Sequence, residues 1–451
     1  MPATRPIRTA TAILSASVLI GWAVRPAQAD ETRHSPYVAS MIKGQEDYVH
    51  VWTAGVQGVG DEADKLVTVD VNPTSKTYGK VVHSLTVGGR GEANHLGFGD
   101  DRKHLWAGRL DDSKMFVFDV GSNPARPRIV KTIIDLPKKT GYVGPRAFCA
   151  VPGRMLVQSL SNSKDHGGMT GIAVYSNKGD FLAKYDMPLE VLGTKGDGFG
   201  YDLAISPAKT VLLSSSFGGR NLYMANPDRL LKESDATRKF GNTLIVWELK
   251  SMRPVRILNV PGSPMEIRWS PRVSDGWAIA ASALTAALSL VRQDAQGLWQ
   301  AREVARIGGP GTSPLPADMS ITADGKGLWL GTFMDGMVRY FDLSDPEHPK
   351  QVYAKRVGSQ VGTVAQSVDG KRIYVSSSLF SNWDKRGADD QQFLALYHWD
   401  GSELKEQWRI DFYREKLGRA GHMQFSARPA RVATPGFGEP PPASPSRPTP
   451  E

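Results

Sequence analysis

The sequence has almost no cysteine, since Cys149 is the only one in 451 residues. A single cysteine cannot form a disulfide within the chain, so the small disulfide-stapled folds are excluded. Only one apolar run, residues 10–23, could enter a membrane, and it is too short to span a bilayer. The 55 Lys and Arg and the 46 Asp and Glu are interspersed, with basic runs no longer than pairs such as Lys138-Lys139. A nucleic-acid partner is therefore not indicated, because it requires a clustered basic patch.

The N-terminus has the pattern of a secretory signal. Arg5 and Arg8 precede the apolar run, and Ala27-Gln28-Ala29 places small residues at the two positions that a signal peptidase reads. The pattern predicts a signal peptide over residues 1–29, cleavage before Asp30, and a periplasmic mature protein with no membrane association. The absence of an Arg-Arg pair gives the twin-arginine route no support. An uncleaved anchor is the alternative.

Standard catalytic signatures are missing from the chain. It contains no Gly-Lys-Ser phosphate loop, no paired-histidine zinc helix and no nucleophile elbow. The glycine-rich run 196–200 leads into Tyr201-Asp202-Leu203, which has the pattern of a strand rather than a helix. We interpret the run as a loop and not as a dinucleotide site.

The chain does contain short apolar β-type runs that arrive in pairs between turn residues, supported by 46 Gly and 30 Pro. The pairs are 49–54 with 66–71, 105–110 with 115–120, 155–160 with 172–175, 211–217 with 244–249, 277–283 with 288–292, 328–333 with 338–343, and 373–379 with 393–399. Successive pairs begin 45 to 65 residues apart, counted from residues 51, 105, 153, 210, 275, 326 and 371. This spacing is typical of propeller blades with loop insertions.

The pattern therefore predicts an all-β chain folded as one seven-bladed β-propeller over residues 30–427. Two β-sandwiches are the alternative, although nothing resembles a linker between them. A weak helical signal at 227–237 indicates an inserted loop. The proline-dense, apolar-poor segment 428–451 predicts a disordered tail.

Candidate metal ligands are few among the nine histidines. His95 and His422 lie outside the strand pairs, where the chain of a propeller can enter the central channel. Together with Cys149 and Met423 they form a nitrogen and sulfur donor set that suits copper. The spacing does not show that these residues meet. The other seven histidines are isolated near termini, turns or strand ends.

Several motifs between residues 47 and 426 resemble the selenium-binding protein family, and in particular its exported bacterial methanethiol oxidases. They are Phe98-Gly99-Asp100-Asp101-Arg102, Trp106-Ala107-Gly108, Leu110-Asp111-Asp112-Ser113, Gly144-Pro145, Gly200-Tyr201-Asp202, Pro264-Met265-Glu266-Ile267-Arg268-Trp269, Asp318-Met319-Ser320, Arg339-Tyr340-Phe341-Asp342-Leu343-Ser344-Asp345-Pro346, Asp369-Gly370-Lys371-Arg372 and Ser378-Leu379-Phe380-Ser381-Asn382-Trp383-Asp384. The resemblance implies a propeller and a copper-dependent oxidase. Such an enzyme converts methanethiol to formaldehyde, hydrogen sulfide and hydrogen peroxide with oxygen.

The sequence departs from the family pattern at the expected metal site. The pattern has a His-His pair where this chain has Asn94-His95, and a histidine where this chain has Arg146. At His422 it commonly adds a second histidine or an acidic group. A guanidinium has no acceptor and cannot ligate a metal. A site built from these positions keeps His95 and His422 and lacks a third ligand unless Cys149 supplies it.

Three hypotheses follow from these residues. The first is a copper oxidase of small thiols with His95 and His422 as ligands. In it Cys149 is a third ligand or holds the substrate, and Glu266 and Asp318 carry protons or support the histidines. Both carboxylates have an equally good interpretation as residues that cap strands.

The second hypothesis is a non-catalytic propeller that binds a protein or small ligand, which Arg146 favours because a cation repels copper. The third is a calcium-dependent hydrolase or lactonase with Glu92, Asp202 and Asp318 as oxygen ligands. A homo-oligomer is compatible with the sequence, which does not determine the oligomeric state.

Overall fold

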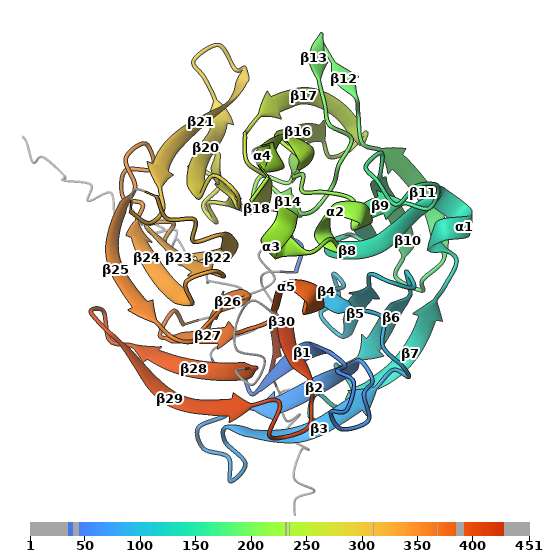
Figure 1. The fold of residues 1–451 in the computed structure, drawn as a ribbon, viewed down its shortest axis with the longest axis vertical. Coiled ribbons are helices and arrows are strands. Elements are labelled where there is room, and N and C mark those ends of the chain that lie inside the picture. The colour runs from blue at the N-terminus through green and yellow to red at the C-terminus, as the bar shows by residue number, and fades with distance from the viewer. Residues whose placement is uncertain are drawn as a thin grey trace, which may run out of the picture.

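Seven four-stranded antiparallel sheets form a closed ring in the computed structural model (Figure 1). The structure describes residues 35–38 and 45–427, except 231, 234, 310, 368 and 385–391. The all-β seven-bladed propeller predicted from the sequence is confirmed, and the two-sandwich alternative is wrong. The predicted signal peptide and C-terminal tail lie outside the described residues.

Each blade has four strands, which we count outward from the channel at the centre of the ring. The innermost strands are β30 (Arg419–Ser426), β4 (Ala93–Phe98), β8 (Tyr142–Val151), β14 (Leu203–Ile205), β18 (Pro264–Trp269), β22 (Pro316–Ile321) and β26 (Thr363–Gln366). The second strands are β1 (Tyr48–Ala54), β5 (His104–Arg109), β9 (Arg154–Asn162), β15 (Val211–Ser214), β19 (Trp277–Ser282), β23 (Gly327–Thr332) and β27 (Arg372–Ser376).

The two outer positions complete the blades. The third strands are β2 (Lys65–Asp70), β6 (Met115–Asp119), β10 (Gly171–Ser176), β16 (Thr243–Glu248), β20 (Ala287–Gln293), β24 (Met337–Asp342) and β28 (Phe393–Trp399). The fourth strands are β3 (Lys80–Thr86), β7 (Arg128–Ile133), β11 (Phe181–Asp186), β17 (Arg253–Asn259), β21 (Trp299–Arg306), β25 (Lys350–Arg356) and β29 (Leu404–Asp411). A small hairpin, β12 (Glu190–Val191) with β13 (Thr194–Lys195), projects from the ring between blades 3 and 4 (Figure 1).

The last strand closes the ring by joining the first blade. Strand β30 pairs with β1, and the sheet order of blade 1 is β3-β2-β1-β30. The innermost strand of blade 1 therefore comes from the C-terminal end of the described chain. This closure brings His422 on β30 next to the innermost strand of blade 2.

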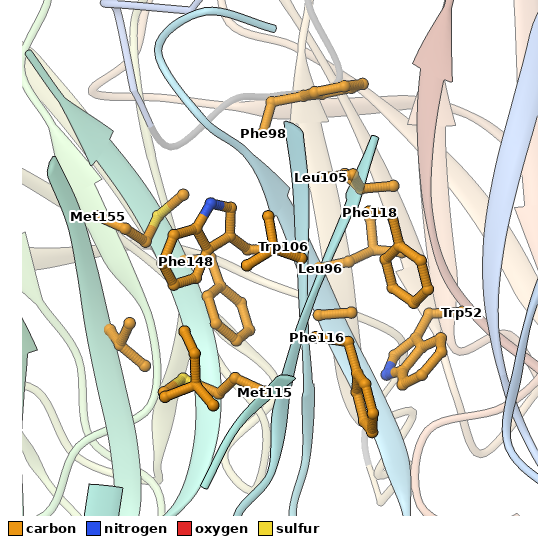
Figure 2. Close-up of a cluster of buried hydrophobic side chains, with 14 of the residues drawn as sticks. Trp52, Leu96, Phe98, Leu105, Trp106, Met115, Phe116, Phe118, Phe148 and Met155 are labelled. Atoms are coloured by element: carbon orange, nitrogen blue, oxygen red, sulfur yellow. The ribbon is translucent and has the colours of Figure 1, made fainter. Parts of the chain in front are cut away.

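Apolar side chains fill the spaces between neighbouring blades. Figure 2 shows blade 2 covered on both sides: Trp52 from blade 1 lies beside Phe116 and Phe118, and Phe148 from blade 3 lies beside Trp106. The Trp52 ring centroid is 5.9 Å from that of Phe116 and 5.8 Å from that of Phe118. Because both faces of an inner or middle strand are buried in this way, such strands have no solvent-facing side.

The seven strand pairs predicted from the sequence are the second and third strands of the seven blades. Asp-Gly turns join the first and second strands of blades 6 and 7. Gly325 and Gly370 have φ of 71° and 76°, a conformation that glycine adopts without strain. The carboxylate of Asp324 accepts the N–H of Lys326 at 3.0 Å and stabilises its turn.

Five short helices are present among the described residues. They are α1 (Leu136–Thr140), α2 (Arg220–Tyr223), α3 (Pro227–Leu230), α4 (Ala236–Lys239) and α5 (Ser381–Asp384). Helices α2 to α4 belong to one connection in blade 4, which confirms the predicted inserted loop. In the described part of the chain no helix combines the length and the apolar character needed to cross a membrane.

Candidate functional site

Five polar side chains on the innermost strands are brought to the channel by irregular strand pairing. They are His95 on β4, Arg146 on β8, Glu266 on β18, Asp318 on β22 and His422 on β30. At or beside each of them the register between the innermost and second strand shifts. Such bulges turn a side chain away from the regular alternation of a strand and are common beside active sites. The backbone irregularity therefore explains how polar groups occur in strands that are otherwise buried and apolar.

The two histidines predicted as metal ligands lie together. The rings of His95 and His422 are stacked, with centroids 4.0 Å apart and planes inclined by 19°. Arg146 Nη2 lies 2.8 Å from His95 Nε2. Because a guanidinium has only donors, Arg146 donates this bond and Nε2 of His95 accepts it, which leaves the proton of a neutral His95 on Nδ1.

Arg146 links the histidines to a buried carboxylate. Its Nη2 also donates to Glu266 Oε1 at 2.9 Å, its Nη1 donates to the carbonyl of Tyr201 at 3.3 Å, and its Cζ lies 3.2 Å from the Tyr201 ring centroid. The side chains of Arg146 and Glu266 have no exposed area. The position expected from the family to hold a third imidazole therefore holds a cation whose partners are all inside the protein.

A second buried arginine, Arg268, collects three carboxylates. It donates to Glu266 Oε2 at 2.8 Å, to Asp318 Oδ1 at 2.9 Å and to Asp202 Oδ2 at 2.8 Å. Two guanidiniums thus face three carboxylates in a water-poor region. If all five groups are ionised, the balance leaves one excess negative charge.

Glu266 is the carboxylate between the two arginines. Its burial, followed by the charge of Asp202, raises its pKa above the ordinary value, whereas Arg268 and Arg146 oppose that rise. Burial also raises the pKa of the Tyr201 phenol, which stays protonated. Glu266 is therefore easier to protonate than an ordinary glutamate.

Asp202 and Asp318 connect neighbouring blades. Asp202 Oδ2 accepts the N–H of Ile267 at 3.1 Å, and Asp318 Oδ2 accepts the N–H of Val364 at 3.0 Å. Each also accepts the N–H of the next residue in its own chain segment, at 2.9 and 2.8 Å. These contacts commit both carboxylates to the main chain and to Arg268.

Cys149 lies apart from the two histidines. Its buried side chain belongs to the apolar cluster between blades 3 and 4, with Leu203 and Ile205 among its members. Burial, reinforced by Asp202, raises the pKa of the thiol well above its ordinary value. A neutral thiol is a poor nucleophile and metal ligand. In this arrangement Cys149 is a core residue.

The arrangement does not fit a copper ion held by the family positions. Within the described ranges no three His, Cys, Asp or Glu side chains are grouped so that they could hold a metal ion. The Nε2 lone pair of His95 accepts from Arg146, and the lone pairs of two stacked rings lie in parallel planes rather than converging on one atom. The same finding applies to the calcium hypothesis, because Glu92, Asp202 and Asp318 are not grouped together.

Arg268 and Tyr201 are the two members of the site that the sequence reasoning did not assign a role. Three of the charged positions share a sequence pattern. Proline stands one or two residues before the charged residue in Pro145-Arg146, Pro264-Met265-Glu266 and Pro316-Ala317-Asp318. Proline lacks the N–H that regular pairing needs, so within a sheet it is found at edge strands, at the first residue of a strand or at a bulge.

Fold and site together define a seven-bladed propeller with stacked histidines and a buried network of arginines and carboxylates at its centre. Residues 27–415 match the model of the 56 kDa selenium-binding protein family, and the chain belongs to this family. It is 55% identical to a methanethiol oxidase of Hyphomicrobium sp over 91% of this chain and 94% of that protein. It is 47% identical to a methanethiol oxidase of Ruegeria pomeroyi over 88% of this chain and 93% of that protein.

Two solved structures share the fold. A hypothetical selenium-binding protein from Sulfolobus tokodaii has a TM-score of 0.73 at 22% identity and covers 88% of this chain and 96% of its own. The periplasmic gluconolactonase of Pseudomonas aeruginosa has a TM-score of 0.60 at 12% identity, with coverage of 85% and 99%. At these identities the likeness concerns the fold alone.

Proposed function

We propose that this protein oxidises methanethiol, or a comparably small thiol, with oxygen. The observation that carries the proposal is the 55% identity to a methanethiol oxidase along 91% of the chain. The balanced reaction takes methanethiol, oxygen and water to formaldehyde, hydrogen sulfide and hydrogen peroxide. The carbon is oxidised, the C–S bond breaks, and oxygen accepts two electrons and two protons.

The buried network supports the proton transfers of this reaction. The pKa of Glu266 is raised by burial, so Glu266 holds a proton more readily than an ordinary carboxylate. We propose that Glu266 carries protons for this reaction through its contact with Arg146. Asp318, whose oxygens are engaged by Arg268 and the main chain, holds the network in place.

Thiol oxidation by oxygen needs a redox centre that protein side chains do not provide by themselves. Copper is the centre that the family resemblance implies, and His95 and His422 are the family positions that would hold it, but the arrangement of these side chains does not fit that ion as it stands. Since Arg146 occupies Nε2 of His95, metal binding there requires the guanidinium to move away from the imidazole. We therefore expect copper to bind weakly in the unmodified protein.

The same observation favours a second candidate function. Arg146 hydrogen-bonds to both His95 and Glu266. These bonds hold the two side chains in place without a metal ion. A non-catalytic propeller that binds a small ligand or a protein at this channel is therefore the alternative. The N-terminal signal pattern supports a periplasmic location for either function.

A methanethiol consumption assay separates the two candidates. Purified mature protein, incubated with copper and methanethiol under air, is compared with His422→Ala and with the control His348→Ala, whose parent histidine is exposed and pairs with Asp345. Oxidation by the unmodified protein and by His348→Ala, together with loss of activity in His422→Ala, supports the oxidase. Absence of methanethiol loss in all three supports the non-catalytic alternative.

A further inference from the structure

The guanidinium of Arg268, on β18 of blade 5, makes five hydrogen bonds, as many as it has N–H groups. Three of these bonds go to the carboxylates of Asp202, Glu266 and Asp318. The other two go to the main chain, from Nε to the carbonyl of Met319 at 3.0 Å and from Nη1 to the carbonyl of Ile267 at 2.7 Å. These acceptors belong to blades 4, 5 and 6. They fix the orientation of the guanidinium from several sides.

Arg146 is held by fewer hydrogen bonds. Its Nη2 donates to His95 and to Glu266, and its Nη1 donates to the carbonyl of Tyr201 at 3.3 Å, a long N–H···O distance. Among the described residues its buried Nε has no hydrogen-bond partner. Both arginine side chains are buried, so the two differ in their bonding, with five bonds for Arg268 and three for Arg146. Arg146 is therefore the arginine that can move with the smaller loss of hydrogen bonds.

Glu266 and Asp318 stand at corresponding places in neighbouring blades but are bonded differently. Each is the third residue of its innermost strand, two residues after a proline and at a shift in register. The two oxygens of Asp318 each accept a main-chain N–H, at 2.8 and 3.0 Å. Glu266 is one methylene longer, and in the described part of the chain its two oxygens accept from side chains, Oε1 from Arg146 and Oε2 from Arg268. The place of its carboxylate thus depends on the two guanidiniums.

We infer that Arg268 is the positioning residue of the site, which keeps Oε1 of Glu266 directed toward Arg146 and the histidine pair. Arg146 Nη2 bonds both Oε1 of Glu266 and Nε2 of His95, so these two acceptors lie beside the same nitrogen. Because Arg268 holds Oε2, Glu266 stays in place when the guanidinium of Arg146 moves away from His95. Arg268 acts through Glu266 and is not itself a catalytic residue. This inference rests on the proposed function, in which Glu266 carries protons.

A crystal structure of Arg146→Met, compared with one of the unmodified protein, tests the positioning without turnover. The variant removes the bond to Oε1 of Glu266 and leaves the five bonds of Arg268 intact. We expect Oε2 of Glu266 to stay within hydrogen-bond distance of Arg268 Nη2 and the carboxylate to keep its place. A Glu266 side chain that turns away from Arg268 in this variant overturns the inference.

Kinetics test the role of Arg268 in the proposed reaction. Arg268→Lys keeps the positive charge, but its single nitrogen cannot reproduce bonds made by three nitrogens. We expect kcat for methanethiol to fall by about tenfold to a hundredfold with little change in KM. The limb of the pH profile that depends on ionised Glu266 should move to higher pH, because burial raises the pKa of Glu266 and Arg268 opposes that rise. Arg339→Lys is the matched control, since Arg339 is a buried arginine on β24 that bonds Asp335 and Gln351; it should keep both kcat and the pH profile.

The two tests separate this inference from the proposed function. If the unmodified protein oxidises no thiol but Glu266 keeps its place in Arg146→Met, the proposed function fails and the positioning by Arg268 stands. If Arg268→Lys and Arg339→Lys have the same kcat and the same pH profile, the inference is overturned. If Arg268→Lys does not fold, the crystal structure of Arg146→Met decides.

Discussion

Removing Arg146 should destabilise the protein through the loss of one buried ion pair. In Arg146→Met, Glu266 loses the guanidinium at 2.9 Å but keeps Arg268 at 2.8 Å on its other oxygen. Breaking a buried pair costs about 3–5 kcal/mol, and the remaining arginine places this case near the lower end, at about 3 kcal/mol. Glu266→Gln removes the charge from the other side of the same pair.

The double-mutant cycle isolates the interaction of Arg146 with Glu266. We expect a coupling energy of about 2 kcal/mol, in the range of hydrogen bonds to charged groups. The free energy of unfolding is measured in urea by fluorescence and by circular dichroism, whose agreement tests two-state behaviour. The cost of Arg146→Met should shrink as pH falls through the raised pKa of Glu266, because protonation removes the buried charge. A coupling below about 0.5 kcal/mol would refute the ion pair.

Three further predictions concern the pH dependence, the metal and the N-terminus. Burial raises the pKa of Glu92 from 4.5 to about 7, so the folded state holds a proton that the unfolded state has lost. The free energy of unfolding should then fall by up to about 3 kcal/mol as pH rises from about 4.5 to about 7. In thermal melts, Glu92→Gln should flatten this decline, and an unchanged dependence of the melting temperature on pH would contradict the assignment. Arg146→His should raise the copper content measured by mass spectrometry, and adding His95→Ala should abolish the gain while His348→Ala leaves it intact; equal copper in all variants would place the site elsewhere. N-terminal sequencing of periplasmic protein should begin at or near Asp30, whereas an intact Met1 in the membrane fraction would rule out cleavage.

The blade count was predictable because the second and third strands are buried on both faces. Strands such as β1 and β2 are apolar runs bounded by turn residues, and their burial is complete. The fourth strands carry no such signal, since β11 alternates between half-buried and exposed residues and β7 is largely exposed. Partner strands of this kind are determined by the blade that they complete and not by their own hydrophobicity.

The site was predictable in part. His95 and His422 could be named because they lie outside the strand pairs, and the structure stacks them. The Arg146 and Glu266 pair joins residues 120 positions apart, and a separation of that size leaves no local pattern in the sequence. Cys149, only three residues beyond Arg146, instead points into the core between blades. Side chains three positions apart point to opposite faces of a regular strand, so nearness in the sequence does not place these two together.

The product balance of one closed-vessel reaction tests the central claim most directly. Purified mature protein supplied with copper receives a known amount of methanethiol, and oxygen uptake, sulfide, formaldehyde and hydrogen peroxide are measured together. Oxidation at the channel predicts that one oxygen is consumed, and one molecule of each product is formed, for every methanethiol lost. Methanethiol that is not consumed, or that is converted to its disulfide without formaldehyde and sulfide, would contradict the account.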